Sequence, residues 1–178
     1  MENTKDKKVS YQWQSWLLLF VVGGIYGFIY EEIFYRIDLG YFVKRGTTFG
    51  PWIPIYGFGA VIIIWLIKRI KDKPILVFTA SVVVSGVIEF VSGYALYHAF
   101  HLRLWDYNTE IWNWLNIGGY VCLRSVLFFG VSACLFQYAV IPLLEKITKN
   151  GTKTFVNIAA VVFAALFMGD ILISLIIK

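Results

Sequence analysis

Long apolar stretches alternate with short polar connections along most of this chain. A helix of about twenty apolar residues spans the roughly 30 Å of a bilayer's hydrocarbon core. Three prolines support the assignment of helix starts, because Pro51 and Pro54 suit the opening of the second stretch and Pro74 the opening of the third. We predict an all-α, polytopic transmembrane bundle of about five spans, at 14–36, 52–70, 75–97, 118–144 and 155–177.

The beginning of the chain combines a basic segment with an apolar run, as a secretory signal also does. The apolar run continues past Gly27 to Tyr35 without a small-residue cleavage site, so we interpret it as the first membrane helix. The domain organisation predicted is a basic cytoplasmic tail over residues 1–12 and a single transmembrane helical domain over 13–178.

Composition agrees with a membrane protein. Of the 178 residues, 59% are hydrophobic and only 15% are charged, and the mean hydropathy is +0.70. This balance departs from that of ordinary soluble domains. The formal net charge of +5 does not indicate a nucleic-acid partner, because most lysines and arginines lie between the apolar stretches. We expect membrane lipid to surround the chain.

The distribution of positive charge predicts an orientation. Ten Lys and Arg residues lie in the N-terminal tail and in the connections after the second and fourth spans, whereas five lie on the opposite side. The positive-inside rule therefore places the N-terminus in the cytoplasm and the C-terminus outside. The two long, residue-rich connections, which follow the first and third spans, would then face outward.

Ionisable residues inside the spans gather at one depth. Each costs about 2.5 to 3.5 kcal/mol at the centre of a membrane helix on insertion scales, so each needs a partner or a function. A rise of 1.5 Å per residue places them all in the predicted outer layer. We expect Glu31 or Glu32, together with Glu89 and Asp170, to face Arg124 around an outward-opening polar pocket. A structural ion-pair network is the alternative.

Glu31 and Glu32 are adjacent, and neighbouring helix positions differ by about 100°, so only one of them is expected to face the bundle. The sequence does not distinguish which one.

The segment "RLWDYNTEIWNW" (103–114) has two parts. Trp112 and Trp114 fit the aromatic belt that anchors membrane proteins at the interface. Belt anchoring does not require the polar residues before them, so we interpret Arg103, Trp105, Asp106 and Tyr107 as a lid over the buried acids.

His98 and His101 are three residues apart and would share one face of a helix, which makes them weak candidates for metal ligands. Because a fixed third ligand is missing from the pattern, we expect interface histidines without a metal. Cys122 and Cys134 are expected to be packing residues.

Two spacings match. Glu31 lies 14 residues before Arg45, and Glu89 lies 14 residues before Arg103. Each arginine is followed by an aromatic loop and a glycine-bearing segment. This pattern is the basis for a hypothesis that two helical hairpins form a parallel repeat, with their loops side by side over a shared site.

Three segments carry a family resemblance: "RGTTFGPWIPIYGFGA" (45–60), "GVIEFVSGYALYHAFHLRLWDYN" (86–108) and "NIGGYVCL" (116–123). Together they resemble the bacterial ABC-transporter permease family called CmpB-type, or type IV, over roughly residues 30–145. His98 stands where the family tends to have an acid. The family pattern falls on Glu32, Arg45, Gly46, Gly50, Pro51, Pro54, Tyr56, Gly57, Glu89, Gly93, Arg103, Trp105, Asp106, Tyr107, Asn116 and Gly118.

The resemblance implies a multi-pass protein of the bacterial cell membrane that takes part in transport. The chain contains no GxxxxGK[ST] sequence, so ATP hydrolysis by P-loop chemistry would need a separate ATPase subunit. We therefore expect a small membrane component that binds a solute or lipid and needs no cofactor. Two alternatives stay open: an accessory or sensor protein that binds a partner through its outer aromatic loops, and an interfacial enzyme acting on a lipid-linked substrate.

Overall fold

The computed structural model describes residues 11–177, and these form six α-helices and one π-helical turn. An isolated bridge between Ile117 and Val121 is the only β-type pairing within that range. The fold class predicted from the sequence is therefore confirmed. The elements are α1 (Trp13–Leu39), α2 (Pro54–Ile67), α3 (Pro74–Phe100), α4 (Leu123–Leu135), the π-turn η1 (Phe136–Val140), α5 (Ile141–Asn150) and α6 (Lys153–Ile177).

Four helical segments are long and apolar enough to cross a membrane, namely α1, α3, α4 continued through α5, and α6. The second span is shorter than predicted, because α2 has 14 residues and is therefore about 21 Å long. At its start, Ile53 is extended and donates its N–H to the Gly24 carbonyl of α1, so the helix begins only at Pro54. At its end, the chain turns between Lys68 and Lys73.

The fourth span begins later than predicted, at Leu123 instead of residue 118. Gly118 and Gly119 both have positive φ, of 62° and 80°, and they form a turn that a helix cannot contain. The helix starts where Cys122 and Ser125 form reciprocal capping hydrogen bonds. Further along, Pro142 lacks the N–H of an ordinary helical residue, and the helix widens into η1 just before it.

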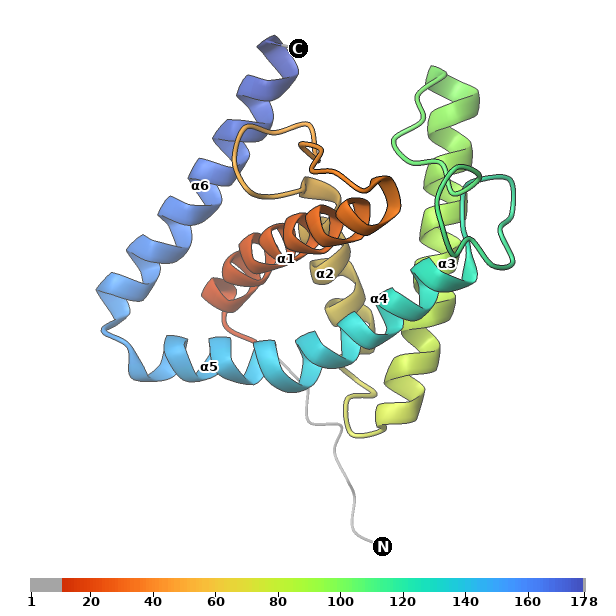
Figure 1. Cartoon of the computed structure of the whole chain (residues 1–178). Coiled ribbons are helices and arrows are strands. Elements are labelled where there is room, and N and C mark those ends of the chain that lie inside the picture. Colours follow the sequence, from red (N-terminus) through yellow and green to blue (C-terminus); the bar gives the residue numbers. More distant parts are fainter. Residues whose placement is uncertain (1–10, 178) are drawn as a thin grey trace, which may run out of the picture.

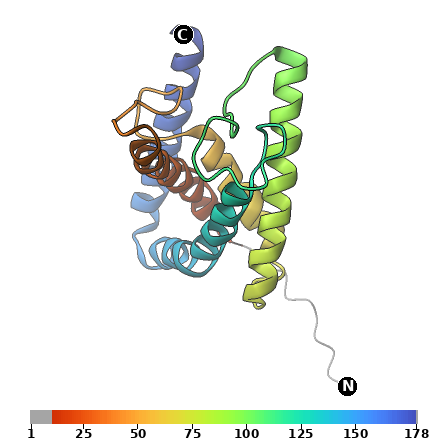
Figure 2. The ribbon, with the colours of Figure 1, turned by 45° about the vertical axis from the view of Figure 1, so that its right-hand side comes forward.

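The centre of the bundle is the contact between α1 and α2, with α6 on one side and α3 and α4 on the other (Figures 1 and 2). Glycines allow the two central helices to approach closely: a Cβ on Gly23 would lie 3.0 Å from the Tyr56 carbonyl oxygen and 3.2 Å from the Gly57 Cα. Apolar side chains from six elements fill the remaining space, including Leu19, Ile64, Val77, Ala133, Phe136, Ile141 and Leu144.

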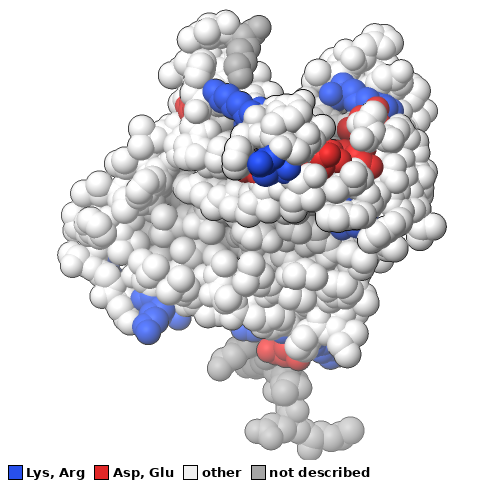
Figure 3. Space-filling view, in the orientation of Figure 1, with Lys and Arg blue, Asp and Glu red and all other residues white. Residues whose placement is uncertain are grey.

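The two long connections, residues 40–53 and 101–122, lie at the same end of the molecule as the C-terminal end of α6 (Figure 1). We call this the loop end. The opposite turn end carries the short turns at 68–73 and 150–152 and the helix α5. Figure 3 shows that charged side chains on this face lie near the two ends, with a broad uncharged band between them. Such a band is what a membrane-spanning bundle requires. The structure does not identify which end faces the cytoplasm, so the orientation stays a prediction.

Candidate functional site

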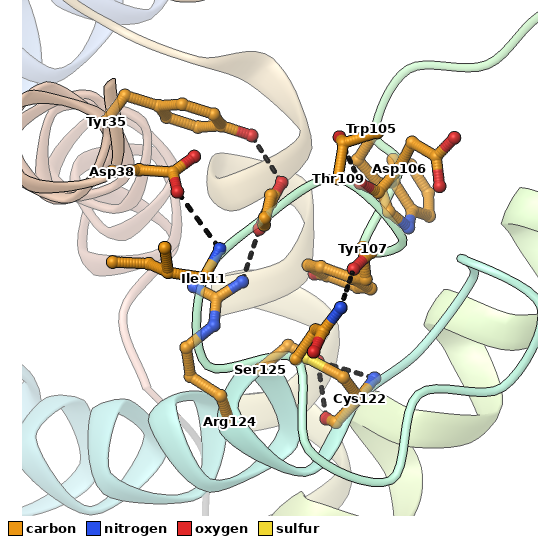
Figure 4. A network of polar contacts seen from close by, with 12 residues as sticks. Tyr35, Asp38, Trp105, Asp106, Tyr107, Thr109, Ile111, Cys122, Arg124 and Ser125 are labelled. Carbon is orange, nitrogen blue, oxygen red and sulfur yellow. Dashed lines mark hydrogen bonds and ion pairs between the residues drawn. The ribbon is translucent and has the colours of Figure 1, made fainter.

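Arg124, in the first turn of α4, is the centre of a polar network at the loop end (Figure 4). Its Nη2 forms an ion pair with Glu110, and its Nη1 donates to the Tyr30 hydroxyl at 2.9 Å. The guanidinium also lies over the Phe34 ring, 3.9 Å from the centroid. Its Nε is buried and has no hydrogen-bond partner among residues 11–177. Arg124 therefore has one unused donor beside the group that neutralises it.

Glu110 comes from the middle of the connection between α3 and α4, and it is held from two sides. The Tyr35 hydroxyl of α1 donates to one carboxylate oxygen, while Arg124 engages the other. Next to it, the Ile111 N–H donates to Asp38 at 3.0 Å, which joins the loop to the end of α1. Burial raises the pKa of Glu110 above its usual value, and the bonds from Tyr35 and Arg124 only partly oppose this.

Glu89, on α3, is 8% exposed and forms the second part of the network. The Tyr107 hydroxyl donates to one of its oxygens, and the Ser125 hydroxyl donates to the other at 2.8 Å. Burial and the neighbouring carboxylate of Glu89 raise the pKa of Tyr107 well above its usual value, so this phenol remains a donor. Glu89 is thus held by hydroxyl groups, whereas Glu110 is held by a cation.

Arg45 connects a third part of the network to the same region. Its Nε lies 3.0 Å from Glu31, its backbone N–H donates to Glu32 at 3.2 Å, and its guanidinium stacks on the Tyr35 ring at 3.6 Å. Arg45 therefore bonds to both adjacent acids, and the expectation that only one of them faces the bundle stays a prediction. A loop residue approaches α1 from the side, so its backbone and side chain reach both carboxylates.

Asp170 does not face Arg124, contrary to prediction. It lies on α6, where it accepts N–H groups from Phe49 at 3.0 Å, Gly50 at 2.7 Å and the Trp52 indole at 2.6 Å. Because α6 packs on the side of α1 away from α4 (Figure 1), the carboxylate fixes the loop 40–53 to the bundle. Asp170 and Arg124 were predicted at a similar depth in the membrane, but they lie on different sides of the bundle.

The predicted lid residues mostly bind one another. Arg103 pairs with Asp106 and donates to the Gly118 carbonyl at 3.1 Å, while the Trp105 indole donates to the Tyr120 carbonyl at 2.8 Å. Asp106 also accepts the Asn108 N–H at 3.0 Å. Partial desolvation would raise the pKa of Asp106, but these donors outweigh it and lower that pKa below its usual value.

Two further predicted site residues have local roles. The Asn116 side chain bonds to Asn108 at 2.8 Å and accepts the Gly119 N–H at 2.9 Å, so it holds the turn before α4. Pro54 is the first residue of α2. Among the lid and turn residues carried over from the sequence, only Tyr107 reaches a buried acid.

The two histidines lie at the end of α3. His98 packs against Tyr94, with ring centroids 4.1 Å apart, and His101 is the C-cap residue with a φ of 53°. Over residues 11–177, no group of three His, Cys, Asp or Glu side chains is arranged to hold a metal ion.

The residues of the network that sequence reasoning missed include Glu110, Tyr30, Tyr35, Asp38 and Ser125. Glu110 is the one carboxylate in "YNTEIWNW", and this isolated acid between the predicted lid and the interface tryptophans is the signal that could have identified it. Ser125 lies three residues after Cys122, at a helix start that the sequence placed five residues too early.

An open polar pocket around these acids was predicted, but in the structure each acid is in direct contact with its partner. Below the network, toward the middle of the bundle, lies a cavity of about 40 Å³ between α1, α2 and α4. Its lining is nearly all apolar and includes Gly23, Tyr56, Phe128 and Phe129. The polar network and the small apolar cavity are therefore separate features of the bundle.

Comparison with known families agrees with the resemblance. The family described as "Putative ABC-transporter type IV" matches residues 18–175, which is most of the chain. This protein therefore belongs to that family. No curated protein and no solved structure matches it.

Proposed function

We propose that this member of the type IV family is an integral membrane component of an ABC-type transport system in the bacterial cell membrane, and that it binds a solute or lipid bearing an oxyanion at its loop end. One observation carries the proposal: the Arg124 side chain is 11% exposed, and its buried Nε–H is unpartnered while Glu110 occupies only the adjacent Nη2. Membership of the family supports the transport role.

The chemistry of the guanidinium gives the ligand class. Nε and Nη2 lie on one edge of the planar group, and a carboxylate or phosphate can accept from both at once. Glu110 uses one of these donors. A ligand oxyanion that displaced Glu110 would satisfy both, and would remove the buried unpaired donor, which costs about 1 to 3 kcal/mol.

The loop 101–122 is the element that would move. Several contacts dock it on the bundle, among them the bond of Tyr107 to Glu89, the bonds of Tyr35 and Arg124 to Glu110, and the bond of the Ile111 N–H to Asp38. Its own hairpin, held by Arg103, Asp106 and Trp105, stays intact when those contacts break. We infer that this loop covers the site as one unit, and that ligand entry exchanges the Glu110 carboxylate for the ligand's oxyanion.

The test uses purified protein in detergent and a panel of inorganic phosphate, glycerol phosphate, citrate and choline, with thermal unfolding as the readout. Wild type is expected to be stabilised by the oxyanions and not by choline. Glu110→Gln removes the internal competitor and keeps its shape, so it should bind the oxyanions more tightly. Arg124→Gln should lose the response.

Arg103→Gln is the matched control, because it removes one arginine of the same loop region that pairs with Asp106 instead. It should respond as wild type does. Weaker oxyanion binding by Glu110→Gln, or an unchanged response of Arg124→Gln, would contradict the proposed site.

The transport role needs its own test. Energy from ATP would come from a separate subunit, since the chain lacks a P-loop sequence. Mild-detergent purification from the native membrane should recover an ATPase with the protein. Recovery of neither an ATPase nor a ligand would argue against the transport assignment.

A second candidate is supported by a different observation. Trp112 and Trp114 are 48% and 59% exposed on the same loop, which suits an accessory or sensor protein that binds a partner at the loop end. In that case a stable complex should survive Glu110→Gln and Arg124→Gln and should be lost on Trp112→Ala with Trp114→Ala.

A further inference from the structure

An open cavity of about 210 Å³ lies at the turn end, far from the network around Arg124. Three segments that are distant in sequence form it: the start of α1, the last turn of α5 and the first turns of α6. It is well above the roughly 15 Å³ that a single water needs, so it can hold a polyatomic group. Its lining is Gln12, Gln14, Thr148, Lys149, Lys153, Val156 and Asn157.

The lining is rich in hydrogen-bond donors and positive charge. Lys149 and Lys153 supply two cations, and the side chains of Gln12 and Asn157 supply amide donors, while the Gln14 Nε2 already donates to Asn157 at 2.7 Å. The nearby Glu145 carries one negative charge against the two lysines, and its carboxylate also accepts the Gln12 N–H at 3.1 Å and the Ser15 hydroxyl at 2.6 Å. Its distance to the Lys149 ammonium is 3.8 Å. The cavity therefore favours an anion.

The position of the cavity indicates where that anion comes from. α5 lies across the turn end in Figure 1, with one face buried and with Lys146 and Ile147 exposed on the other. An amphipathic helix of this kind lies at the level of the lipid headgroups. At the same end, Trp13 is half exposed and the Lys68 ammonium lies over the rings of Trp16 and Trp65, as at an interfacial belt.

The first turn of α6 adds to this setting. Its N–H groups point toward the cavity end of the helix and favour negative charge there. Just beyond them, Phe155 and Ile158 are exposed, at 72% and 57%. A phosphate seated beside Lys153 would thus have an apolar surface next to it along which acyl chains can lie.

We propose that this cavity binds the phosphate headgroup of an anionic membrane phospholipid, with Lys149 and Lys153 as its charge partners and the amides of Gln12 and Asn157 as further donors. The lipid would join the ends of α1, α5 and α6, which meet there. This site is separate from the one proposed around Arg124, and neither depends on the other.

Native mass spectrometry of the full chain in detergent tests the proposal. The probes are phosphatidylglycerol, phosphatidylcholine with the same acyl chains, and glycerol phosphate as a soluble anion. Wild type should retain phosphatidylglycerol in preference to phosphatidylcholine. Lys149→Gln with Lys153→Gln should lower that retention by more than about tenfold, as the loss of two interfacial lysines implies.

The matched control is Lys71→Gln with Lys146→Gln, which removes the same charge from the same end but outside the cavity lining. The control variant should lower the retention of phosphatidylglycerol far less than the cavity variant does. Lys149→Arg with Lys153→Arg should retain the lipid, which separates loss of binding from misfolding. Equal losses in the cavity and control variants, equal retention of both lipids, or full competition by glycerol phosphate would each overturn the proposal.

Discussion

Two glutamate–arginine pairs with the same spacing in sequence have different fates in the structure. Glu31 and Arg45 form an ion pair at 3.0 Å, whereas Arg103 pairs with Asp106 and Glu89 bonds to Tyr107 and Ser125. The parallel repeat that the spacing suggested does not extend to these contacts.

Helix length explains the difference. α1 ends eight residues after Glu31, and Gly40 then turns the chain with a φ of 81°, so the loop returns over the last turns of the helix. α3 continues for eleven residues beyond Glu89, which is about 17 Å. Arg103 is only three residues beyond Phe100, a step of at most about 11 Å. The Arg103 backbone therefore falls short of the level of Glu89, and its side chain pairs with Asp106 in its own loop.

The two loops are consequently docked by opposite charges. The loop 40–53 brings the cation Arg45 to acids on α1, while the loop 101–122 brings the acid Glu110 to a cation on α4. In the loop movement that we propose, the second arrangement would leave the cation Arg124 in the bundle. This is why an anionic ligand suits the site around Arg124, and why changes to the two loops should have unequal effects.

The largest effect is expected from Arg124→Gln. It leaves Glu110, whose side chain is 6% exposed, without its cation, and breaking a buried pair in this way costs about 3 to 5 kcal/mol. The free energy of unfolding in mixed micelles measures it. Arg124→Lys keeps the charge but loses the planar guanidinium, so its free energy of unfolding should lie between those of wild type and Arg124→Gln. A loss as small as that from Arg103→Gln would contradict the buried pairing.

Arg45→Gln should have the next largest effect. Glu31 and Arg45 are partly exposed, at 15% and 25% of their side chains, so the loss should be about 1.5 to 3 kcal/mol, as for a hydrogen bond to a charged group. Adding Glu31→Gln to Arg45→Gln should lower the free energy of unfolding only slightly further. A double-mutant cycle over these variants gives the coupling, and an additive result would argue against the pair.

Glu89→Gln should cost less, about 1 kcal/mol, because the amide oxygen can still accept from Tyr107 or Ser125. Glu89→Leu removes both acceptors and should cost about 1 to 3 kcal/mol. Denaturant unfolding of the two variants side by side measures the difference. If Glu89→Gln were as damaging as Arg124→Gln, then Glu89 would have to be held by a cation after all.

Arg103→Gln should have the smallest effect at neutral pH. Arg103 pairs with Asp106 in an exposed part of the loop, and exposed pairs often contribute nothing measurable. The midpoint of thermal unfolding should match that of wild type. A marked loss would mean that the Arg103 bond to the Gly118 carbonyl, and not the ion pair, holds the hairpin.

Acid should weaken the hairpin in a defined range. The pKa of Asp106 is lowered in the folded protein, so its contribution is present above the usual Asp pKa of about 3.9 and is lost as pH falls through the lowered value. Amide hydrogen exchange of residues 103–120 should therefore speed up below about pH 4. Asp106→Asn should remove most of this pH dependence, and an unchanged profile would contradict it.

The sequence alone determined the helical membrane fold, the family and most of the polar residues at the loop end. Those features depend on local properties of the chain. The length of an apolar stretch determines whether it can form a membrane helix, and the motifs around Arg45, Glu89 and Asp106 are read directly along the sequence. Proline and glycine positions also placed several boundaries, though the extended Ile53 shortened α2 and the turn at Gly118 and Gly119 delayed α4.

Only the tertiary structure decided which polar groups meet. Depth along a helix is a one-dimensional quantity, so it grouped Asp170 with Glu89 although they lie on helices at opposite sides of the bundle. The path of each loop decided the rest: the turn at Gly40 brings Arg45 back to Glu31, and the hairpin after α3 places Glu110 on Arg124. A buried charge takes whichever partner the chain path brings within reach, because leaving it unpaired costs more than any preference encoded by spacing.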